Sequence, residues 1–121
     1  MSDPGNLGPA GEEIAVRHLT EKGYTIRHRN WKQGQKEIDI VAENDNIIVF
    51  VEVKTRINNY YLHPSAAVTG KKQKMIILAA DTYLRIYNID KESRFDVITV
   101  LSDGKNFNVD HIENAFYPTL R

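Results

Sequence analysis

Hydrophobic residues recur along the chain with either a helical or a strand period, which predicts two helices and five strands. The helical ranges are 9–22 and 70–87. Gly23 follows the first range as a stop signal, and Thr69 precedes the second as its N-cap. The second helix is expected to face the core through Met75, Leu78, Ala79 and Ile86.

Alternating or continuously apolar runs predict strands over residues 24–31, 37–43, 47–55, 94–101 and 106–112. Turn-forming residues at 44–46 separate the second run from the third. The stretch from Ile47 to Val51 is apolar at every position, so helices should cover both faces of this strand. The pattern therefore predicts one α/β domain over residues 1–121, with a loose tail over residues 1–7.

The composition excludes several classes of protein. Hydrophobic residues make up 41% of the chain, which suffices for one core. No apolar run approaches the ~20 residues of a membrane-spanning helix, so no membrane is expected as a partner. The start of the chain lacks the basic and apolar regions of a signal peptide, and the absence of Cys excludes disulfides and thiolate metal sites. These features favour a cytoplasmic location.

The predicted hairpin gathers charged residues on one face. If a tight turn is centred on residues 45–46, then Asp39 lies opposite Glu52 and Glu37 lies opposite Lys54. Because side chains alternate between faces, these four would project together at the end far from the turn. The other face would carry only core residues: Ile38, Ile40, Val49, Val51 and Val53.

Carboxylates held this close raise one another's pKa, and a divalent cation would relieve the repulsion. Oxygen ligands favour Mg²⁺ or Mn²⁺, which Asp39 and Glu52 would hold together with the carbonyl of Val53. Such a metal activates water, and Lys54 would stabilise charge on a phosphoryl group. The alternative is that these residues form ordinary cross-strand pairs on a solvated face.

The formal net charge is +0, so any affinity for nucleic acid must come from local clusters of basic residues. One cluster surrounds Trp31, and another begins the second predicted helix. Trp31 would either stack on a base or cover the edge of the core, and the basic residues would equally suit solvated faces. The candidate contacts with nucleic acid are Arg29, Trp31, Lys32, Lys36, Arg56, Lys72 and Gln73.

Segments 37–40 (EIDI) and 49–56 (VFVEVKTR) resemble the PD-(D/E)xK signature of restriction-endonuclease-like nucleases. More narrowly, nearly the whole chain is similar to the small bacterial YraN family. Further matches to that family are Gly8, Gly11, Glu12, Ala15, Leu19, Asn30, Ala67, Val68, Thr69, Lys72, Gln73, and segments 94–97 and 111–116. Lys36 departs from the pattern, because the family usually has Gly at this position.

The resemblance implies a restriction-endonuclease-like fold, with a mixed central sheet of about five strands flanked by helices. It implies Asp39, Glu52 and Lys54 as active-site positions. Related Holliday-junction resolvases carry a glutamate on the first helix that supports the metal site, and Glu12 matches it. The alternative for Glu12 is an acid that complements the helix dipole.

We therefore expect a Mg²⁺- or Mn²⁺-dependent endonuclease-like phosphodiesterase that acts on DNA, with branched or damaged substrates as candidates. Two alternatives stay open from the residues alone. One is a nucleic-acid-binding module without turnover, and the other is a structural or protein-interaction domain. A homodimer or a protein partner would help a neutral domain to hold its substrate.

Overall fold

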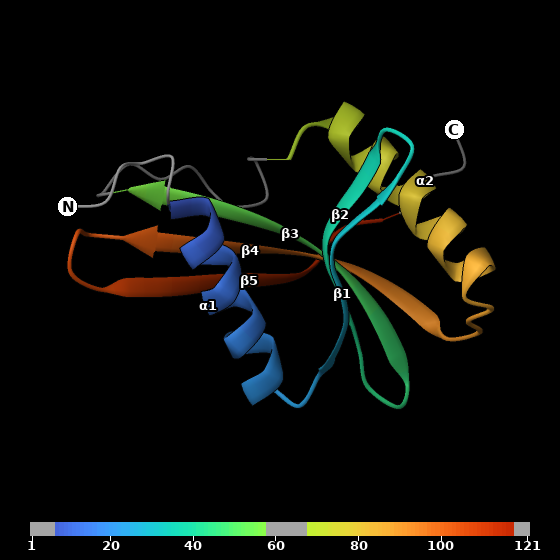
Figure 1. Ribbon diagram of the computed structural model, residues 1–121, viewed down its shortest axis with the longest axis horizontal. Coiled ribbons are helices and arrows are strands. Elements are labelled where there is room, and N and C mark those ends of the chain that lie inside the picture. Colours follow the sequence, from blue (N-terminus) through green and yellow to red (C-terminus); the bar gives the residue numbers. More distant parts are fainter. Residues whose placement is uncertain (1–6, 58–67, 118–121) are drawn as a thin grey trace.

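Across residues 7–57 and 68–117, which the computed structural model describes, a five-stranded sheet carries one helix on each face (Figure 1). The elements are α1 Leu7–Glu21, β1 Thr25–Gln33, β2 Lys36–Glu43, β3 Ile47–Ile57, α2 Gly70–Ile86, β4 Glu92–Ser102 and β5 Phe107–Phe116. The predicted elements are confirmed, although β5 extends to Phe116 rather than Ile112. Leu7 begins α1, so the rest of the predicted tail lies outside the described residues, as does Ala67.

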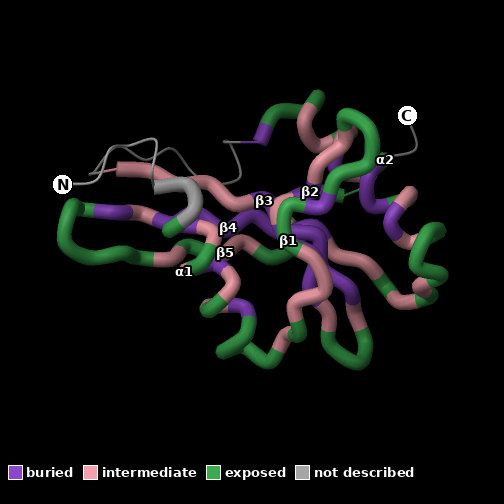
Figure 2. Tube along the Cα trace, in the orientation of Figure 1, coloured by how far each residue is buried: buried purple, intermediate pink, exposed green. Residues whose placement is uncertain are grey.

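The strand order is β1-β2-β3-β4-β5, with β3 and β4 parallel and the other neighbours antiparallel. This mixed sheet was expected. The middle strand β3 is buried on both faces, as its apolar run predicted: Ile48 and Phe50 pack toward α2, and Val49 and Val51 pack toward α1. Buried residues accordingly gather in the central part of the sheet (Figure 2).

The end of α1 follows from Gly23, which adopts a φ of 97° that side chains disfavour. The N–H of Gly23 donates to the carbonyl of Thr20, and the N–H of Tyr24 donates to that of Leu19, both at 3.0 Å. This pair of bonds is a Schellman motif, which satisfies carbonyls at the end of the helix. The helix then packs Ala15 and Leu19, both fully buried, against the sheet.

The core-facing side of α2 differs from the predicted one. Thr69 caps the helix as expected, and its hydroxyl accepts from the N–H of Lys72. However, the buried residues are Ile76, Ala79, Ala80 and Tyr83. The prediction was wrong for Leu78 and Ile86, which are 58% and 51% exposed. Tyr83 takes the core position because Arg27 and His28 on β1 satisfy its hydroxyl.

In β1, the side chain of Arg29 lies on the α1 face of the sheet, whereas the side chain of Trp31, two residues later, lies on the α2 face. Asn30, with a φ of 51°, lies between them and interrupts the regular alternation. Arg29 is opposite Ile40 and Trp31 is opposite Ile38, so β2 changes face at the same level. Ile38 therefore packs in the core beneath α2, and its predicted place beside Ile40 was wrong.

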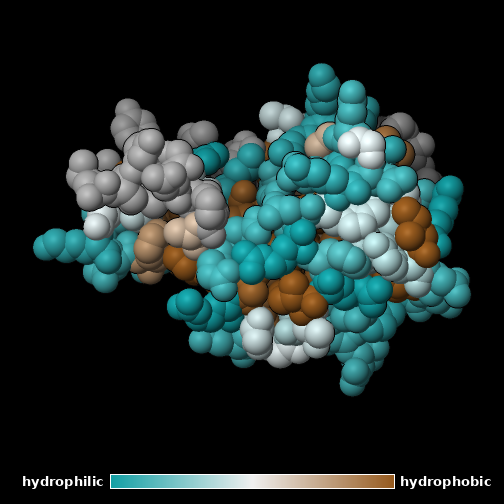
Figure 3. Space-filling model, in the orientation of Figure 1, coloured by the Kyte–Doolittle hydropathy of each residue, from teal (hydrophilic) through white to brown (hydrophobic). Residues whose placement is uncertain are grey.

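Hydrophilic residues dominate the face seen in Figure 3, with small apolar patches between them. Within the described ranges, no helix combines the length and the apolar character needed to cross a membrane.

Candidate active site

The β2–β3 hairpin has the register that its turn residues predicted. The N–H of Asn44 donates to the carbonyl of Ile47 at 3.0 Å, which closes a two-residue turn. The side-chain oxygen of Asn44 accepts from the N–H groups of Asn46 and Ile47, both at 2.9 Å. From there the strands pair up to Ile40 and Val51. Asp39 and Glu52 are the next residues on each strand.

Beyond the pair Ile40–Val51, the carboxylate of Asp39, rather than a backbone carbonyl of β2, accepts a hydrogen bond from β3. Its Oδ2 accepts a hydrogen bond of 2.8 Å from the N–H of Val53. The β2–β3 pairing ends at this level, where β3 continues to pair with β4 as far as Ile57. The side chain of Asp39 is thereby fixed against β3 next to Glu52.

Glu52 is a buried carboxylate, 5% exposed, that two lysines approach. Its Oε2 lies 3.4 Å from the Nζ of Lys54 and 3.1 Å from the Nζ of Lys72. Lys54 follows Glu52 on β3, whereas Lys72 comes from the first turn of α2. The sequence placed Lys72 among contacts with nucleic acid and offered no signal that it would reach Glu52.

The pKa values reflect this crowding. Burial raises the pKa of Asp39, and the nearby charge of Glu52 raises it further, to about 7, although the Val53 N–H opposes the shift. Burial disfavours the charged form of Lys72, but the attraction of Glu52, Asp39 and Glu37 outweighs it and raises the pKa of Lys72. The repulsion between Asp39 and Glu52 would be relieved by a cation bound to both carboxylates.

The donor set fits a hard divalent cation with an incomplete protein shell. Within residues 7–57 and 68–117, no three His, Cys, Asp or Glu side chains are grouped to hold a metal. Two carboxylates are nevertheless a common protein contribution to a Mg²⁺ site, because water and substrate phosphate supply the remaining oxygens. Asp39 and Glu52 offer such a pair, and the carbonyl of Val53 stays the predicted third ligand.

Glu12 does not join the two carboxylates directly. Its Oε1 accepts from the Nε of Arg29 at 3.1 Å and from the Nδ2 of Asn30 at 2.9 Å. Asn30 stands between the residues of β1 that pair with Ile40 and Ile38, and it is therefore at the level of Asp39. Glu12 thus anchors the irregular point of β1 beside the candidate site.

Gly11 explains how α1 approaches β3 so closely. A Cβ atom at this position would overlap the Oγ1 of Thr55, so no side chain fits there without a shift. Thr55 follows Lys54 on β3, so this contact places the start of α1 near the far end of the candidate site. Neither the close approach nor its partner was evident from the helical pattern.

Trp31 is part of the core. It is 8% exposed, its ring packs edge-on against Tyr83, and its Nε1 donates to the hydroxyl of Tyr87 at 3.3 Å. The structure therefore supports the interpretation that Trp31 covers the core edge.

The other residues predicted to contact nucleic acid have different partners from Lys72, which pairs with Glu52. Lys32 is exposed and Lys36 is half-buried, both near the β1–β2 turn. Arg29 pairs with Glu12 and with Glu13. Arg56 donates to the carbonyl of Thr55, and Gln73 donates to the carbonyl of Val68. These last two bonds stabilise the local backbone.

A second polar network joins β4, β5 and α1. Asp96 is fully buried and receives two hydrogen bonds from Arg94, at 2.9 and 2.8 Å. His111 also bonds Asp96 at 2.8 Å, and His18 bonds His111 across 93 positions of sequence at 3.0 Å. Arg94 and Asp96 lie two positions apart on β4, which is an interior strand of the sheet.

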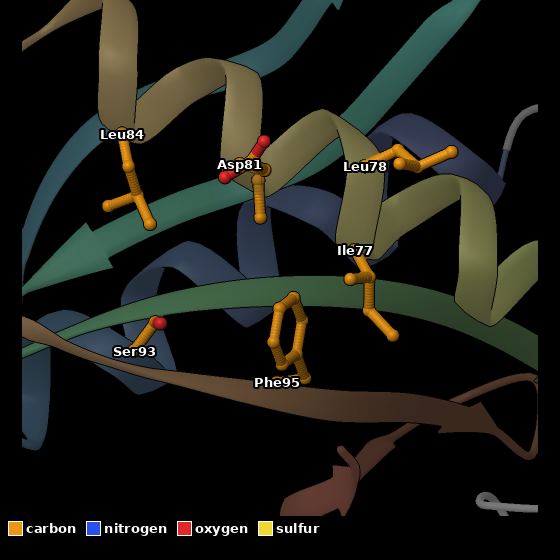
Figure 4. A pocket seen from close by; sticks show the side chains of 7 residues that line it. Ile77, Leu78, Asp81, Leu84, Ser93 and Phe95 are labelled. Atoms are coloured by element: carbon orange, nitrogen blue, oxygen red, sulfur yellow. The ribbon is translucent and has the colours of Figure 1, made fainter. Parts of the chain in front are cut away.

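An apolar groove of about 290 Å³ lies between α2 and the start of β4 (Figure 4). Leu78, Leu84 and Phe95 line it, with Asp81 at its rim. None of the proposed metal ligands contributes to this groove, so it is separate from the candidate site.

The mixed five-stranded sheet with a helix on each face is a restriction-endonuclease-like fold. The structure is similar to that of the Holliday junction resolvase Hjc of Archaeoglobus fulgidus, with a TM-score of 0.50. The match covers 87% of this chain and 75% of that chain at 17% sequence identity, so it shows the fold alone.

A model described as "Uncharacterised protein family UPF0102" matches residues 11–100, and the chain belongs to this family, which is also known as YraN. A UPF0102 protein of Bacteroides thetaiotaomicron is 50% identical over 120 residues, which cover 99% of each chain. Those of Parabacteroides distasonis and Flavobacterium psychrophilum are 40% and 39% identical, over 100% and 97% of this chain and 100% and 98% of theirs.

Proposed function

We propose that this protein is a Mg²⁺- or Mn²⁺-dependent nuclease that hydrolyses phosphodiester bonds in DNA. The observation that carries the proposal is the pairing of Asp39 with the buried Glu52 where β2 and β3 part, with Lys54 and Lys72 at the Glu52 carboxylate. The restriction-endonuclease-like fold supports it, because nucleases are built on this fold.

The roles follow from the positions of the charges. Asp39 and Glu52 would hold the cation, with the Val53 carbonyl completing the protein's share of the ligands. A divalent cation in such a site supplies an activated water and polarises a phosphoryl oxygen. Lys54 would place positive charge where negative charge develops on the phosphoryl group. Glu12 would act as a positioning residue, since it holds Asn30 at the level of Asp39.

The state of Asp39 sets the expected pH dependence. A carboxyl group must lose its proton before it binds a metal. Because the pKa of Asp39 is about 7 without metal, affinity for the cation should fall by about tenfold per pH unit as the pH decreases below that value. Cleavage at a limiting metal concentration should fall in the same way.

Branched DNA is the first substrate to examine, because the structural neighbour is a Holliday junction resolvase. The formal net charge of +0 argues against strong binding to long duplexes by one copy of the chain. A second copy or a protein partner would supply the missing contacts with phosphate. We place the reaction in the cytoplasm, where bacterial DNA is found.

A cleavage panel tests the proposal. Single strands, duplexes and four-way junctions of DNA, and matching RNAs, would be incubated with Mg²⁺ or Mn²⁺. Asp39→Asn, Glu52→Gln and Lys54→Met should each reduce cleavage by about 10²-fold or more, since each removes a charge acting at the reacting phosphate. Asp81→Asn is the matched control, because it neutralises an exposed acid of α2 that pairs only with Arg85 within the described residues.

The panel also separates the alternatives. Salt-sensitive binding that survives Asp39→Asn and Glu52→Gln, without cleavage under any metal, would favour a nucleic-acid-binding module. No binding and no cleavage would favour an interaction domain. Cleavage that persists at wild-type rates in the Asp39→Asn and Glu52→Gln variants would show that the reaction occurs elsewhere or comes from a contaminant.

A further inference from the structure

One oxygen of the Glu52 carboxylate has two ammonium neighbours, and they differ in how firmly they are held. Lys72 is nearer, at 3.1 Å, and its side chain is 41% exposed. Lys54 is 3.4 Å away, and its side chain is 20% exposed. The shorter ion pair is therefore made by the lysine that has more contact with solvent.

Lys72 is also attracted electrostatically by acids other than Glu52. Glu52, Asp39 and Glu37 all favour its charged form. Its ammonium group thus occupies the region where a divalent cation bound by Asp39 and Glu52 would be most strongly attracted. A cation of higher charge in that region would repel Lys72 and would compete with it for the same oxygen.

The structure allows Lys72 to move without disturbing the helix. Its backbone is held by the cap, because its N–H donates to the Thr69 hydroxyl at 3.2 Å. Its flexible four-carbon side chain can carry the ammonium away from Glu52 into solvent while the backbone stays in place. Lys54 lacks this freedom, since it is less exposed and belongs to the central strand.

We propose that Lys72 is a displaceable cation that couples the binding of a divalent metal to the binding of a nucleic-acid phosphodiester. Without ligands, its ammonium group neutralises Glu52. Lys72 would leave Glu52 to pair with a bound phosphodiester, and Glu52 would then be free to serve as a metal ligand. With a cation held by Asp39 and Glu52, Lys72 would in turn be free to pair with phosphate. This inference rests on the proposed function, because it takes the same carboxylates as metal ligands.

Coupling of this kind must be reciprocal at equilibrium. DNA should therefore strengthen metal binding by the same factor by which metal strengthens DNA binding. Without Lys72, the metal meets no competitor at Glu52, so it should bind more tightly in the absence of DNA. The added effect of DNA should then become smaller.

The test uses the full chain and Ca²⁺, which takes oxygen ligands as Mg²⁺ does. Calorimetric titration would give the Kd for Ca²⁺ in the wild-type protein and in Lys72→Met. Lys71→Met is the matched control, because it removes the same charge from the same turn at an exposed position. Each titration would be repeated with a four-way DNA junction, after subtraction of Ca²⁺ binding to the DNA alone, and thermal denaturation would confirm that the variants fold.

Without DNA, Lys72→Met should bind Ca²⁺ about 3- to 10-fold more tightly than wild type, the range expected when a partly buried ion pair no longer competes. Lys71→Met should change the Kd by less than about twofold, because water and salt screen exposed charges. DNA should tighten Ca²⁺ binding at least about threefold more in wild type than in Lys72→Met.

Equal Ca²⁺ affinities in Lys72→Met and Lys71→Met, with the same effect of DNA in both, would overturn the inference while leaving the proposed metal site intact. If neither wild type nor Lys72→Met binds Ca²⁺, Mg²⁺ or Mn²⁺, the proposed function fails and this inference fails with it. Loss of Ca²⁺ binding in Glu52→Gln is the result that would tie the measured affinity to the site.

Discussion

Replacing Asp39 by Asn removes one charge from the carboxylate pair and keeps an oxygen that can accept the Val53 N–H. The variant should lose metal binding, yet without metal it should be more stable than the wild-type protein. Burial and the charge of Glu52 raise the pKa of Asp39 from 3.8 to about 7 in the folded protein. Asn at this position avoids the cost of holding that charge.

The size of the gain follows from the shift. A carboxyl group whose pKa rises from 3.8 to about 7 costs on the order of 4 kcal/mol as an anion at pH 8. Asp39 is only partly buried, and water screens some of this cost, so we expect Asp39→Asn to gain about 2 kcal/mol. For a chain of this length the melting temperature should rise by about 6–10 °C.

The sign of the pH dependence is fixed by linkage. The folded protein binds the Asp39 proton more tightly than the unfolded chain does, so the wild-type protein loses stability as the pH rises from about 4 to about 7. The variant has no such proton to lose. Its advantage over wild type should therefore be largest at pH 8 and less than half as large at pH 5.

Urea denaturation at pH 5 and pH 8, with a chelator present, measures both quantities. The exposed-acid control Asp81→Asn should change the free energy of unfolding by less than about 0.5 kcal/mol at either pH. Two results would refute the assigned crowding of Asp39 and Glu52. One is an Asp39→Asn variant that is no more stable than wild type at pH 8, and the other is an equal gain in the free energy of unfolding at pH 5 and pH 8. Added Mg²⁺ should stabilise wild type at pH 8 and leave Asp39→Asn unchanged.

Three further substitutions test the surrounding structure by denaturation. Gly11→Ala should cost about 1–3 kcal/mol, because its methyl group would meet the stiff Thr55 side chain, and Thr55→Ala should restore most of that loss. Thr69→Ala removes the cap of α2 and should cost about 1 kcal/mol; no loss would show that the cap contributes nothing. Asp96→Asn should cost about 3–5 kcal/mol at pH 7, because it removes the buried anion of Arg94 and leaves only the more exposed Glu113 as its partner within the described residues. Hydrogen bonds from His111 and Arg94 lower the pKa of Asp96 despite its burial, so this difference should shrink as the pH falls below about 4.

The elements and the hairpin register were predictable because they depend on neighbours along the chain. Gly23 and Thr69 mark the two helix ends through local backbone chemistry. The turn at Asn44 sets the β2–β3 register, and the alternation of side chains then places Asp39 beside Glu52. Lys54 follows two positions later on the same face, so the spacing of these three residues was enough to group them.

Other features needed the packed molecule. Asn30, with a positive φ, interrupts β1 at the level of Asp39, and Ile38 packs on the other face of the sheet from Ile40, whereas strict alternation would have kept the two together. On α2, several apolar residues compete for the core, and the hydrogen bonds of Tyr83 to β1 decide which stripe is buried. The pattern of apolar positions along the sequence does not show where a strand twists or which groups a hydroxyl will bond.

By itself the sequence determined two helices, five strands and a hairpin that pairs two carboxylates, because periodicity and turn chemistry act between residues close along the chain. Only the tertiary structure decided that Lys72 reaches Glu52, that Glu12 binds Asn30, and that Asp96 lies within an interior strand. These contacts join elements far apart in sequence. They depend on how the helices pack on the sheet. That packing is set by the burial of apolar groups and the pairing of charges throughout the core.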